Sequence, residues 1–456
     1  MPRRPEDTTV LLTGANGFVG SHITDALLRN GYRVRTMVRV TSNRQWLERK
    51  PVEVVYASLD EPERLRKAVE GVDAIIHNAG VVAAPGKYHY YRHNADGTRL
   101  LAEAAHDAAS GLQRFVYVSS EAAGGPTHNS RPRRESDPPQ PITDYGQSKL
   151  VAEGHLQRFQ DNFPITIVRP PAIYGPRDTA WLPLFQLISN GWLPLIGRHR
   201  QLSLTHAQDL ARQVVLQMEH PDAVGEIFYA APYDPVSYED FGHTISKVLS
   251  ARPKLVTVPD ELIRVGYPLV HPLIKLFGKP PFQKDKLPDV LAPRWTISGE
   301  KARNRLGFEG KMPLLAGVGQ TAEWYRWKKW IESPRDRLKK KRGSHTRKRK
   351  VDGQVRAYDP TCDLCALAMD GEVKTPLHYE DDEFVIVDCL ICRVPMAVLK
   401  EHRSSFTDDE KQRLLKIFAD LFGDKHHPDF EQRRIPEHAH VHYRTTPHLL
   451  PWQKRV

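Results

Sequence analysis

Short apolar runs alternate with amphipathic stretches along the first 170 residues of the chain. The apolar runs predict strands at 9–12, 34–38, 52–56, 74–77, 115–118 and 165–168. The amphipathic stretches predict helices at 21–30, 61–70, 98–109 and 145–160. Such alternation is typical of a parallel sheet covered by helices on both faces, so we expect an α/β fold with a doubly wound sheet.

A glycine-rich segment, Thr13-Gly-Ala-Asn-Gly-Phe-Val-Gly20, joins the first predicted strand to the first predicted helix. Gly14 suits a tight turn, Gly17 lets the backbone approach a pyrophosphate, and Gly20 lets the helix pack near the strand. The N–H groups at the start of the helix can then bind phosphate. A turn used only for packing is the alternative, but the strand before it and the helix after it favour a dinucleotide site.

The end of the second predicted strand indicates which dinucleotide is bound. An acidic residue there favours NAD, whereas an arginine accommodates the additional phosphate of NADP. Here the strand ends in Arg39, and no acidic residue lies between Arg39 and Glu48. We therefore expect NADP, with NAD as the alternative if Arg39 is only a solvated surface charge. Asn94 either lies at the cofactor site or caps the following helix.

Polar side chains that could carry catalysis follow the fifth predicted strand. Ser119, Ser120 and Glu121 come directly after it, at the edge of the sheet where open α/β folds bind ligands. Tyr145 and Lys149 are four residues apart, so on a helix they share a face. We expect the lysine to lower the pKa of the phenol, which then acts as a general acid or base. Tyr-x-x-x-Lys alone is also common on ordinary helix surfaces.

Residues 8 to about 330 resemble the extended short-chain dehydrogenase/reductase family. The resemblance is carried by Thr13-Gly-x-x-Gly-x-x-Gly20, Asn94-x-x-Gly-Thr98, Val118-Ser-Ser120, Tyr145-Gly-x-Ser-Lys149 and Arg169-Pro-Pro-Ala-Ile-Tyr-Gly-Pro176. It implies a Rossmann-type fold, a catalytic set of Ser120, Tyr145 and Lys149, and a ribose contact by Lys149. The expected cofactor-binding residues are Gly14, Asn16, Gly17, Phe18, Val19, Gly20, Arg39, Ala79, Gly80, Tyr145, Lys149 and Pro170.

The last of these motifs is similar to the branch of the family that contains 3β-hydroxysteroid dehydrogenases and dihydroflavonol reductases. That resemblance implies hydride transfer between a secondary alcohol and a ketone. Glu121, directly after Ser120, departs from the pattern of this branch. Some sugar-nucleotide dehydratases of the wider family place a catalytic acid in this region. A nucleotide-sugar epimerase or dehydratase is therefore the alternative function. A cofactor-sensing binding protein without turnover is the second alternative.

Residues 177–330 have a less regular pattern that prolines interrupt, which is typical of a small lobe covering the substrate. Asp209 is expected to cap a helix at 210–218. Residues 261–282 mix apolar and basic side chains. They could contact a membrane surface or cover an apolar substrate, but Pro268 and Pro272 interrupt any continuous amphipathic helix, so ordinary packing is favoured.

The length of 456 residues predicts more than one domain. The net charge of +11 comes mainly from one short segment. Residues 335–350 contain ten Lys or Arg and one Asp, which leaves the rest of the chain near neutrality. We expect domains at 1–332 and 355–456, joined by a basic, flexible linker at 333–354. The linker argues for a solvated tether rather than a nucleic-acid or membrane partner.

All four cysteines lie after residue 360, in the pairs Cys362/Cys365 and Cys389/Cys392. This spacing favours a metal site in a reducing compartment over scattered disulfides. His402 follows later, and His438, His440 and His442 alternate so that on a strand they share one face. The two cysteine pairs together could form a tetrahedral zinc site, and a domain without metal is the remaining alternative.

Residues 355–456 resemble the histidine-triad family in Cys362-x-x-Cys365, Tyr379-Glu-Asp-Asp, Leu399-Lys-Glu-His402 and His438-x-His-x-His442. The resemblance implies an α+β domain with zinc held by Cys362, Cys365, His402 and His438. It also implies that His440 is the nucleophile toward a nucleotide phosphate. The glycine-rich segment before the triad is replaced by Arg433-Arg-Ile-Pro-Glu-His, which argues against hydrolysis.

The whole chain is therefore expected to be a multidomain, NADP- or NAD-dependent oxidoreductase with zinc in its C-terminal domain. Its substrate is expected to be a small-molecule alcohol, ketone or nucleotide sugar, and a nucleotide is compatible with the C-terminal domain. No apolar run reaches the roughly 20 residues of a membrane helix, and no signal peptide is visible. A cytoplasmic location follows, and a homodimer is compatible with the sequence.

Overall fold

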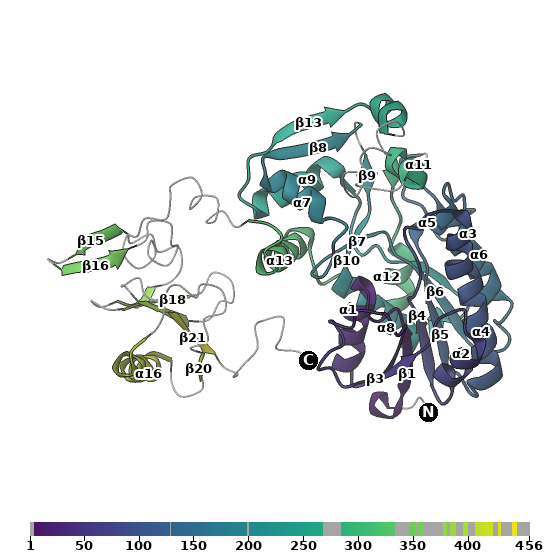
Figure 1. Ribbon diagram of the computed structural model, residues 1–456, viewed down its shortest axis with the longest axis horizontal. Helices are drawn as coiled ribbons and strands as arrows, with labels where there is room; N and C mark the ends of the chain where they lie inside the picture. Colours follow the sequence, from purple (N-terminus) through teal and green to yellow (C-terminus); the bar gives the residue numbers. More distant parts are fainter. Residues whose placement is uncertain are drawn as a thin grey trace. The chain divides into compact units, whose positions relative to one another are not determined.

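The protein is described by a computed structural model in which the chain divides into two compact units, Met1–Ile331 and Glu332–Val456. The residues described are 4–127, 129–197, 200–267, 284–332, 347–351, 354–358, 377–380, 384–388, 395–399, 406–422, 427–429 and 440–444. Each unit is considered by itself (Figure 1). The predicted division into 1–332, 333–354 and 355–456 stays a prediction.

A seven-stranded parallel sheet forms the centre of the first unit, in the order β11-β6-β5-β4-β1-β2-β3. Its strands are β1 (Thr9–Thr13), β2 (Arg33–Val38), β3 (Val52–Tyr56), β4 (Ala74–His77), β5 (Arg114–Val118), β6 (Ile165–Arg169) and β11 (Ile227–Tyr229). The strand order reverses beside β1, as in dinucleotide-binding sheets. The expected doubly wound, Rossmann-type sheet is thus confirmed, with β11 as an additional strand at its edge.

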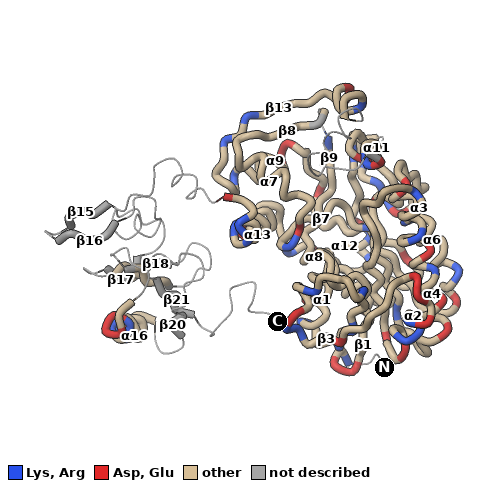
Figure 2. The backbone as a smooth tube through the Cα atoms, in the orientation of Figure 1, with Lys and Arg blue, Asp and Glu red and all other residues tan. Residues whose placement is uncertain are grey.

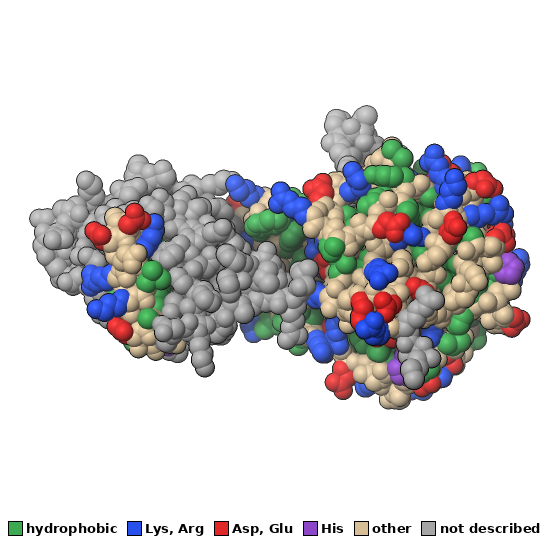
Figure 3. Space-filling view, turned by 90° about the horizontal axis from the view of Figure 1, so that it is seen from below, with side chains coloured by type: hydrophobic (Ala, Val, Ile, Leu, Met, Phe, Trp, Pro, Cys, Tyr) green, Lys and Arg blue, Asp and Glu red, His purple; other side chains and the backbone are tan. Residues whose placement is uncertain are grey.

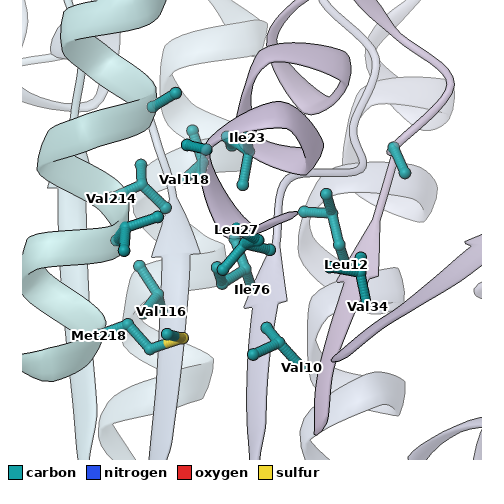
Figure 4. Close-up of a cluster of buried hydrophobic side chains, with 14 of the residues drawn as sticks. Val10, Leu12, Ile23, Leu27, Val34, Ile76, Val116, Val118, Val214 and Met218 are labelled. Carbon is teal, nitrogen blue, oxygen red and sulfur yellow. The ribbon is translucent and has the colours of Figure 1, made fainter. Parts of the chain in front are cut away.

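Helices cover both faces of this sheet (Figure 1), and a buried core lies on each side of it. They are α1 (Phe18–Arg29) and α8 (Ala207–Glu219) on one face, and α2 (Pro62–Val69), α4 (Gly97–Ala108) and α6 (Asp144–Gln157) on the other. Val10 and Leu12 pack with Ile23 and Val214 toward the first pair (Figure 4), whereas Leu11 packs toward the second face. The alternation of strand side chains therefore builds two cores.

A smaller lobe follows the sheet and has a core of its own, formed by buried residues such as Phe185, Phe241 and Tyr325. Its helices are α7 (Leu182–Ser189), α9 (Tyr238–Val248), α11 (Leu287–Leu291) and α13 (Leu314–Trp327), whereas α12 (Glu300–Leu306) packs against β11 of the main sheet. Its strands are β7 (Ala172–Tyr174), β8 (Trp192–Ile196), β9 (Gln201–Leu202), β10 (Leu204–His206), β12 (Val236–Ser237), β13 (Lys254–Val258) and β14 (Arg294–Trp295). Residues 268–283, which include most of the apolar and basic segment noted above, lie outside the described residues.

The expected helix cap by Asp209 is wrong, and so is the cap that was one of the two alternatives for Asn94. Asp209 lies in the first turn of α8, whose N-cap is His206. The buried Asp209 carboxylate instead accepts hydrogen bonds from the backbone N–H groups of Lys311 and Met312, at 3.0 Å each. Asn94 lies inside the π-helix η2 (Tyr91–Asp96), which continues from α3 (Lys87–Tyr90) into α4, so it is not a cap either. Both side chains hold distant segments together, which local spacing does not reveal.

The described part of the second unit is an α+β arrangement. Its antiparallel sheet has the order β17-β18-β19-β21-β20. The elements are β17 (Leu377–Glu380), β18 (Phe384–Asp388), β19 (Pro395–Leu399), α16 (Asp408–Phe422), β20 (His427–Asp429) and β21 (His440–Arg444). Phe384, Ile386 and Ala397 of the sheet pack against Leu414 and Phe418 of α16.

A separate pair of strands, β15 (Arg347–Val351) and β16 (Gln354–Tyr358), spans the predicted boundary between linker and module. Two residues, Asp352-Gly353, stand between them in the sequence, a dipeptide typical of two-residue hairpin connections. Part of the expected linker is thus paired backbone.

Charged residues of the first unit are distributed over its surface in both signs (Figure 2). On the face drawn in Figure 3, Lys and Arg side chains are interspersed with Asp and Glu. Most of the basic segment 335–350 lies outside the described residues. Among the helices that are described, none is long and apolar enough to cross a membrane.

Candidate functional site

The glycine-rich turn lies where β1 ends and α1 begins, and its geometry requires glycine at two positions. Gly14 has a φ of 68°, and a Cβ there would lie 2.9 Å from the backbone of Ala79. A Cβ on Gly20 would lie 2.1 Å from the carbonyl oxygen of Gly14. The first close approach joins the ends of β1 and β4, and the second packs α1 against the turn.

The start of α1 suits a phosphate group. The helix has 12 residues, and its N-cap is Gly17, which has no side chain to occupy the free N–H groups of the first turn. A Cβ on Gly17 would meet only the carbonyl oxygen of Gly14, at 3.4 Å, so the backbone there is open to a ligand. Asn16 lies in the turn, and Phe18 and Val19 open the helix. These residues fit the pyrophosphate of a dinucleotide.

A buried histidine holds the second part of this edge in place. His77, the last residue of β4, contacts the hydroxyls of Thr13 and Thr98 at 2.8 and 2.9 Å. The Thr13 hydroxyl also accepts a hydrogen bond from the Ala79 N–H at 3.0 Å. Burial, with the charge of Lys149, lowers the pKa of His77 to about 3, so the ring is neutral. His77 was read only as a strand residue in the sequence, and it fixes the loop that carries Ala79 and Gly80.

Asn94 is a structural clamp beside the predicted cofactor loop. Its side-chain oxygen accepts from the Val81 N–H at 2.8 Å, and its amide donates to the Val81 carbonyl at 3.0 Å. It also donates to the Ser148 hydroxyl at 3.0 Å, which ties the loop after β4 to α6. A Cβ on Gly80 would lie 2.9 Å from the Asn94 side chain and 3.5 Å from the Lys149 ammonium. Gly80 therefore permits this loop to lie against Lys149.

Tyr145 and Ser120 lie together near the carboxyl end of β5. Tyr145 lies in the first turn of α6, whose N-cap is Thr143, and Ser120 is the N-cap of α5 (Glu121–Gly124). Both are hydrogen-bonded to each other. Burial raises the pKa of Tyr145 to about 12; the Ser120 hydrogen bond lowers it, whereas the Asp289 and Glu121 carboxyl groups raise it. The phenol therefore holds its proton at neutral pH.

Lys149 is buried one turn after Tyr145, but its ammonium group has a different partner from the one expected. It donates to the Val118 carbonyl at 2.8 Å and lies 4.7 Å from the centre of the Tyr117 ring. Burial lowers the pKa of Lys149 to about 8, against the opposing charge of Glu153. The pKa of Tyr145 is raised overall, so the expected net lowering by Lys149 is not seen.

A buried ion pair fixes the helix that carries Tyr145 and Lys149. Glu153 of α6 accepts from the Arg169 guanidinium at 2.9 and 2.5 Å, and both side chains are at most 4% exposed. Glu153 also accepts from the Ser119 hydroxyl at 2.5 Å. Glu153 was missed in the sequence analysis, although its position four residues after Lys149, on the same helix face, was a usable signal.

Two remaining predicted cofactor residues lie at the same edge of the sheet. Arg39 follows β2 and is exposed, and its backbone N–H donates to the Ser42 hydroxyl at 3.1 Å. Pro170 follows β6, and its carbonyl accepts from the Glu121 N–H at 2.9 Å. All the predicted residues of the first unit thus lie in the segments that follow β1, β2, β4, β5 and β6, the strand ends where open α/β sheets bind ligands.

The lobe contributes a cluster of charged groups that the sequence analysis missed. The Lys286 ammonium lies 3.8 Å from the centre of the Tyr145 ring and 3.4 Å from the Asp289 carboxylate. Burial raises the pKa of Asp289, and burial together with Asp289 raises the pKa of Glu121 well above its usual value. No sequence signal could have found this cluster, because about 140 residues separate Lys286 from Tyr145.

The predicted metal ligands cannot be placed in this structure. Cys362, Cys365, Cys389, Cys392, His402 and His438 all lie outside the described residues. His440 and His442 belong to β21, where His440 pairs with Val398 and His442 with Met396. Within the described ranges, no group of three or more His, Cys, Asp or Glu side chains could hold a metal ion.

Known proteins share the sequence and fold of the first unit. Residues 10–231 match the NAD dependent epimerase/dehydratase family. The chain is 31% identical over 325 residues to a ceramide reductase of Caulobacter vibrioides, covering 71% of this chain and 96% of that protein. It is 27% identical over 329 residues to a decarboxylating sterol-4-alpha-carboxylate 3-dehydrogenase of Dictyostelium discoideum, covering 68% and 99%.

A crystal structure of DesIV, a dTDP-glucose 4,6-dehydratase of Streptomyces venezuelae with NAD and TYD bound, has a similar fold. Its TM-score is 0.59 and its identity 24%, and the match covers 71% of this chain and 99% of that chain. The chain therefore belongs to the NAD dependent epimerase/dehydratase family. It is an enzyme of the NAD(P)-dependent dehydrogenase, reductase or epimerase/dehydratase type.

Proposed function

We propose that the first unit is an NADP-preferring oxidoreductase that interconverts a secondary alcohol and a ketone. The observation that carries this proposal is the buried phenol of Tyr145, hydrogen-bonded to Ser120 at the carboxyl edge of the sheet, with Lys149 one turn away. Such an arrangement can move one proton to or from a substrate oxygen. The similarity of this chain to a ceramide reductase and to a sterol dehydrogenase supports the assignment.

Each catalytic residue has a separate task. When bound, the nicotinamide ring supplies or takes up the hydride at the carbinol carbon. Tyr145 gives its hydroxyl proton to the substrate oxygen during ketone reduction and takes that proton back during alcohol oxidation. Ser120 orients the same oxygen by a hydrogen bond. Because Tyr145 is protonated at neutral pH, the site is better prepared for ketone reduction than for the reverse reaction.

The binding of NADP rests on the predicted cofactor residues. The N-terminus of α1 and the glycine turn would hold the pyrophosphate, and Lys149 would contact the nicotinamide ribose. Arg39, at the end of β2, is the group that accepts the additional phosphate of NADP. The Arg39 side chain has no hydrogen bond or ion pair with any described residue, which supports a free guanidinium for that phosphate.

The substitution Tyr145→Phe tests the proposal. It removes the proton donor while keeping the ring, so kcat should fall by about 10²- to 10⁴-fold. Binding of NADPH, followed by fluorescence titration, should be unchanged. Tyr88→Phe makes the same chemical change on a side chain that is 67% exposed and should leave kcat unchanged. Substrates are found by a ketone and alcohol library monitored by nicotinamide absorbance, and normal turnover by Tyr145→Phe would refute the assignment.

Glu121 supports a second candidate, a nucleotide-sugar epimerase or dehydratase. Its carboxyl group is buried and its raised pKa keeps it protonated, so it is a second acid beside Tyr145. A dehydratase requires such an acid to protonate a leaving hydroxyl. These reactions return the hydride to the substrate, so product forms without net change in nicotinamide absorbance. Chromatographic product analysis of UDP- and dTDP-sugars, beside the absorbance assay, distinguishes the two candidates.

We also propose that the second unit is a zinc-bearing, histidine-triad-like module that binds a nucleotide. The paired positions of β19 and β21 support it, because His440 lies opposite Val398 on neighbouring strands of the sheet. His402 follows the end of β19 by three residues, and His438 precedes β21 by two. Zinc there would be held by Cys362, Cys365, His402 and His438, with Cys389 and Cys392 as the alternative partners of the first cysteine pair. The same arrangement would leave His440 for the phosphate.

A further inference from the structure

The segment formed by η4 (Lys284–Lys286) and α11 is held by several independent contacts with α3, β14 and Arg200. The Tyr90 hydroxyl donates to Asp285 at 2.7 Å, and the Trp295 indole donates to the Asp289 carbonyl at 2.9 Å. Arg200 donates to the Val290 and Ala292 carbonyls at 2.5 and 2.8 Å. These bonds hold the Asp285 side chain before Lys286 and the backbone carbonyls after it, which places the ammonium group.

That place is the face of the Tyr145 ring. The distance of 3.8 Å from the ammonium nitrogen to the ring centre is well inside the range of a cation–π contact. Lys286 is only 17% exposed, so water screens its charge weakly. A cation on the face of a phenol ring favours the deprotonated ring, which carries more negative charge.

We propose that Lys286 is a positioning residue of the lobe that stabilises the deprotonated form of Tyr145 and so promotes proton uptake by this tyrosine. The inference rests on the proposed role of Tyr145 as proton carrier. The cation on the face of the Tyr145 ring is Lys286, whereas the Lys149 ammonium donates to the Val118 carbonyl.

Asp289 acts in the opposite sense to Lys286. Its carboxylate raises the pKa of Tyr145, and its contact with the Lys286 ammonium at 3.4 Å partly neutralises both charges. Removing Lys286 therefore has two effects of the same sign, because the cation is lost and the Asp289 charge is no longer compensated. Removing the Asp289 charge leaves Lys286 uncompensated beside the ring.

Other titratable groups face Tyr145, and they remain the same in both variants. They are Tyr90 of α3, Tyr117 of β5 and Glu121 of α5, with Lys149 one turn along α6; Asp285 of η4 is bonded to Tyr90. Because Lys286→Met and Asp289→Asn leave this background constant, the difference between the two variants isolates the pair. Opposite shifts are a signature that loss of folding or packing does not produce.

The experiment measures the pH dependence of kcat/KM for alcohol oxidation at saturating cofactor. Oxidation needs the deprotonated phenol, so its acidic limb reports the ionisation of Tyr145. Lys286→Met should move that limb to higher pH by about one unit, which lowers the rate at a fixed pH on the limb about tenfold. Asp289→Asn should move it to lower pH, and Lys286→Arg should restore the original position.

Lys301→Met is the matched control. Lys301 also lies on an aromatic ring, 4.8 Å from the centre of Phe228, and pairs with Glu226 at 2.7 Å, but it does not contact Tyr145. The limb should not move in this variant. If Lys286→Met and Asp289→Asn shift the limb in the same direction, or leave it in place, the inference is wrong.

A second readout does not depend on turnover. A fluorinated tyrosine at position 145 has a lower intrinsic pKa and a fluorine resonance whose titration reports the phenol directly. The apparent pKa should be higher with Lys286→Met and lower with Asp289→Asn than in the otherwise unchanged chain. If these shifts appear but no alcohol or ketone is turned over, the proposed function fails and the role of Lys286 stands. If turnover is present and the resonance does not respond, only the role of Lys286 fails.

Discussion

Two serines follow one another at the end of β5, and they have different partners. The Ser119 hydroxyl donates to Glu153 at 2.5 Å and is buried in the ion pair with Arg169. Ser120 caps α5, accepting from the Ala122 N–H at 3.2 Å, and is hydrogen-bonded to Tyr145. Only Ser120 is therefore placed to share a substrate oxygen with Tyr145. The catalytic role of Ser120, which the family resemblance implies, stays a prediction.

Arg39 gives a prediction about cofactor preference at the scale of one side chain. Arg39→Ala should weaken NADPH binding by about tenfold or more, because a charged hydrogen bond to the additional phosphate is lost. NADH binding should change little. Fluorescence titration with each reduced cofactor measures both. Arg33→Ala, at the opposite end of β2 and 65% exposed, is the control that should affect neither. Equal losses for the two cofactors would contradict the role.

Single residues were predictable where a local pattern fixed their surroundings. The glycine turn and the Tyr145–Lys149 spacing are short-range features, and both fall where the pattern put them. The ionisation of Tyr145 was not predictable, because it depends on burial and on Asp289, which is 144 residues away. Spacing alone suggested that Lys149 would act on the phenol. The Val118 carbonyl, brought close by β5, takes that ammonium group instead.

Helix α6 carries two of the three proposed catalytic side chains, and one buried ion pair joins it to β6. Glu153→Gln removes the charge that Arg169 needs at a buried site, and breaking such a pair costs about 3–5 kcal/mol of unfolding free energy. We expect a lower midpoint in urea unfolding and a lower kcat, because Lys149 and Tyr145 lie on the same helix. Glu103→Gln, which breaks an exposed pair with Arg99 on α4, should change stability by less than about 1 kcal/mol.

That prediction separates a positioning role from simple loss of folding. Activity is measured at a temperature where Glu153→Gln is fully folded by circular dichroism. If kcat is then normal, the pair stabilises the fold without orienting α6 for catalysis. If kcat is reduced while NADPH binding is retained, α6 is misplaced although the sheet is intact. Unchanged stability would contradict the buried pair itself.

Elements were predictable to the extent that hydrophobic periodicity is local. Six strands of the main sheet and the helices between them fall near their expected ranges, because each has its own apolar pattern. The seventh strand, β11, has only three residues and pairs with β6 across about 60 residues of chain. A helix start at Asn94 was one expectation, because asparagine is a frequent cap. The Asn94 side chain instead lies in the π-helix η2 and forms hydrogen bonds with Val81 and Ser148.

At the scale of the whole molecule, the proposed catalytic and positioning residues and the predicted metal ligands fall in different units. Ser120, Tyr145, Lys149 and Lys286 belong to Met1–Ile331, and the cysteine pairs and the triad histidines to Glu332–Val456. The composition change near residue 333 and the confinement of cysteine to the C-terminal part already suggested such a division. The sequence could not indicate the antiparallel order of the second sheet, which depends on pairing between β19 and β21 across about 40 residues.

The separation predicts that zinc and cofactor binding are independent. Metal analysis of the full-length chain, purified under reducing conditions, should find about one zinc ion per chain. If the site is of the histidine-triad type, His402→Ala and His438→Ala should release the metal and Cys389→Ser should retain it. If both cysteine pairs form the site, Cys389→Ser and Cys392→Ser should release it and the histidine variants should retain it. His243→Ala, an exposed histidine of the first unit, is the control.

NADPH binding should be the same in all of these variants, because the predicted cofactor residues lie in the first unit. A chain that contains no stoichiometric zinc, with its circular dichroism unchanged, would rule out both arrangements, whereas loss of NADPH binding together with zinc would show that the two units are coupled.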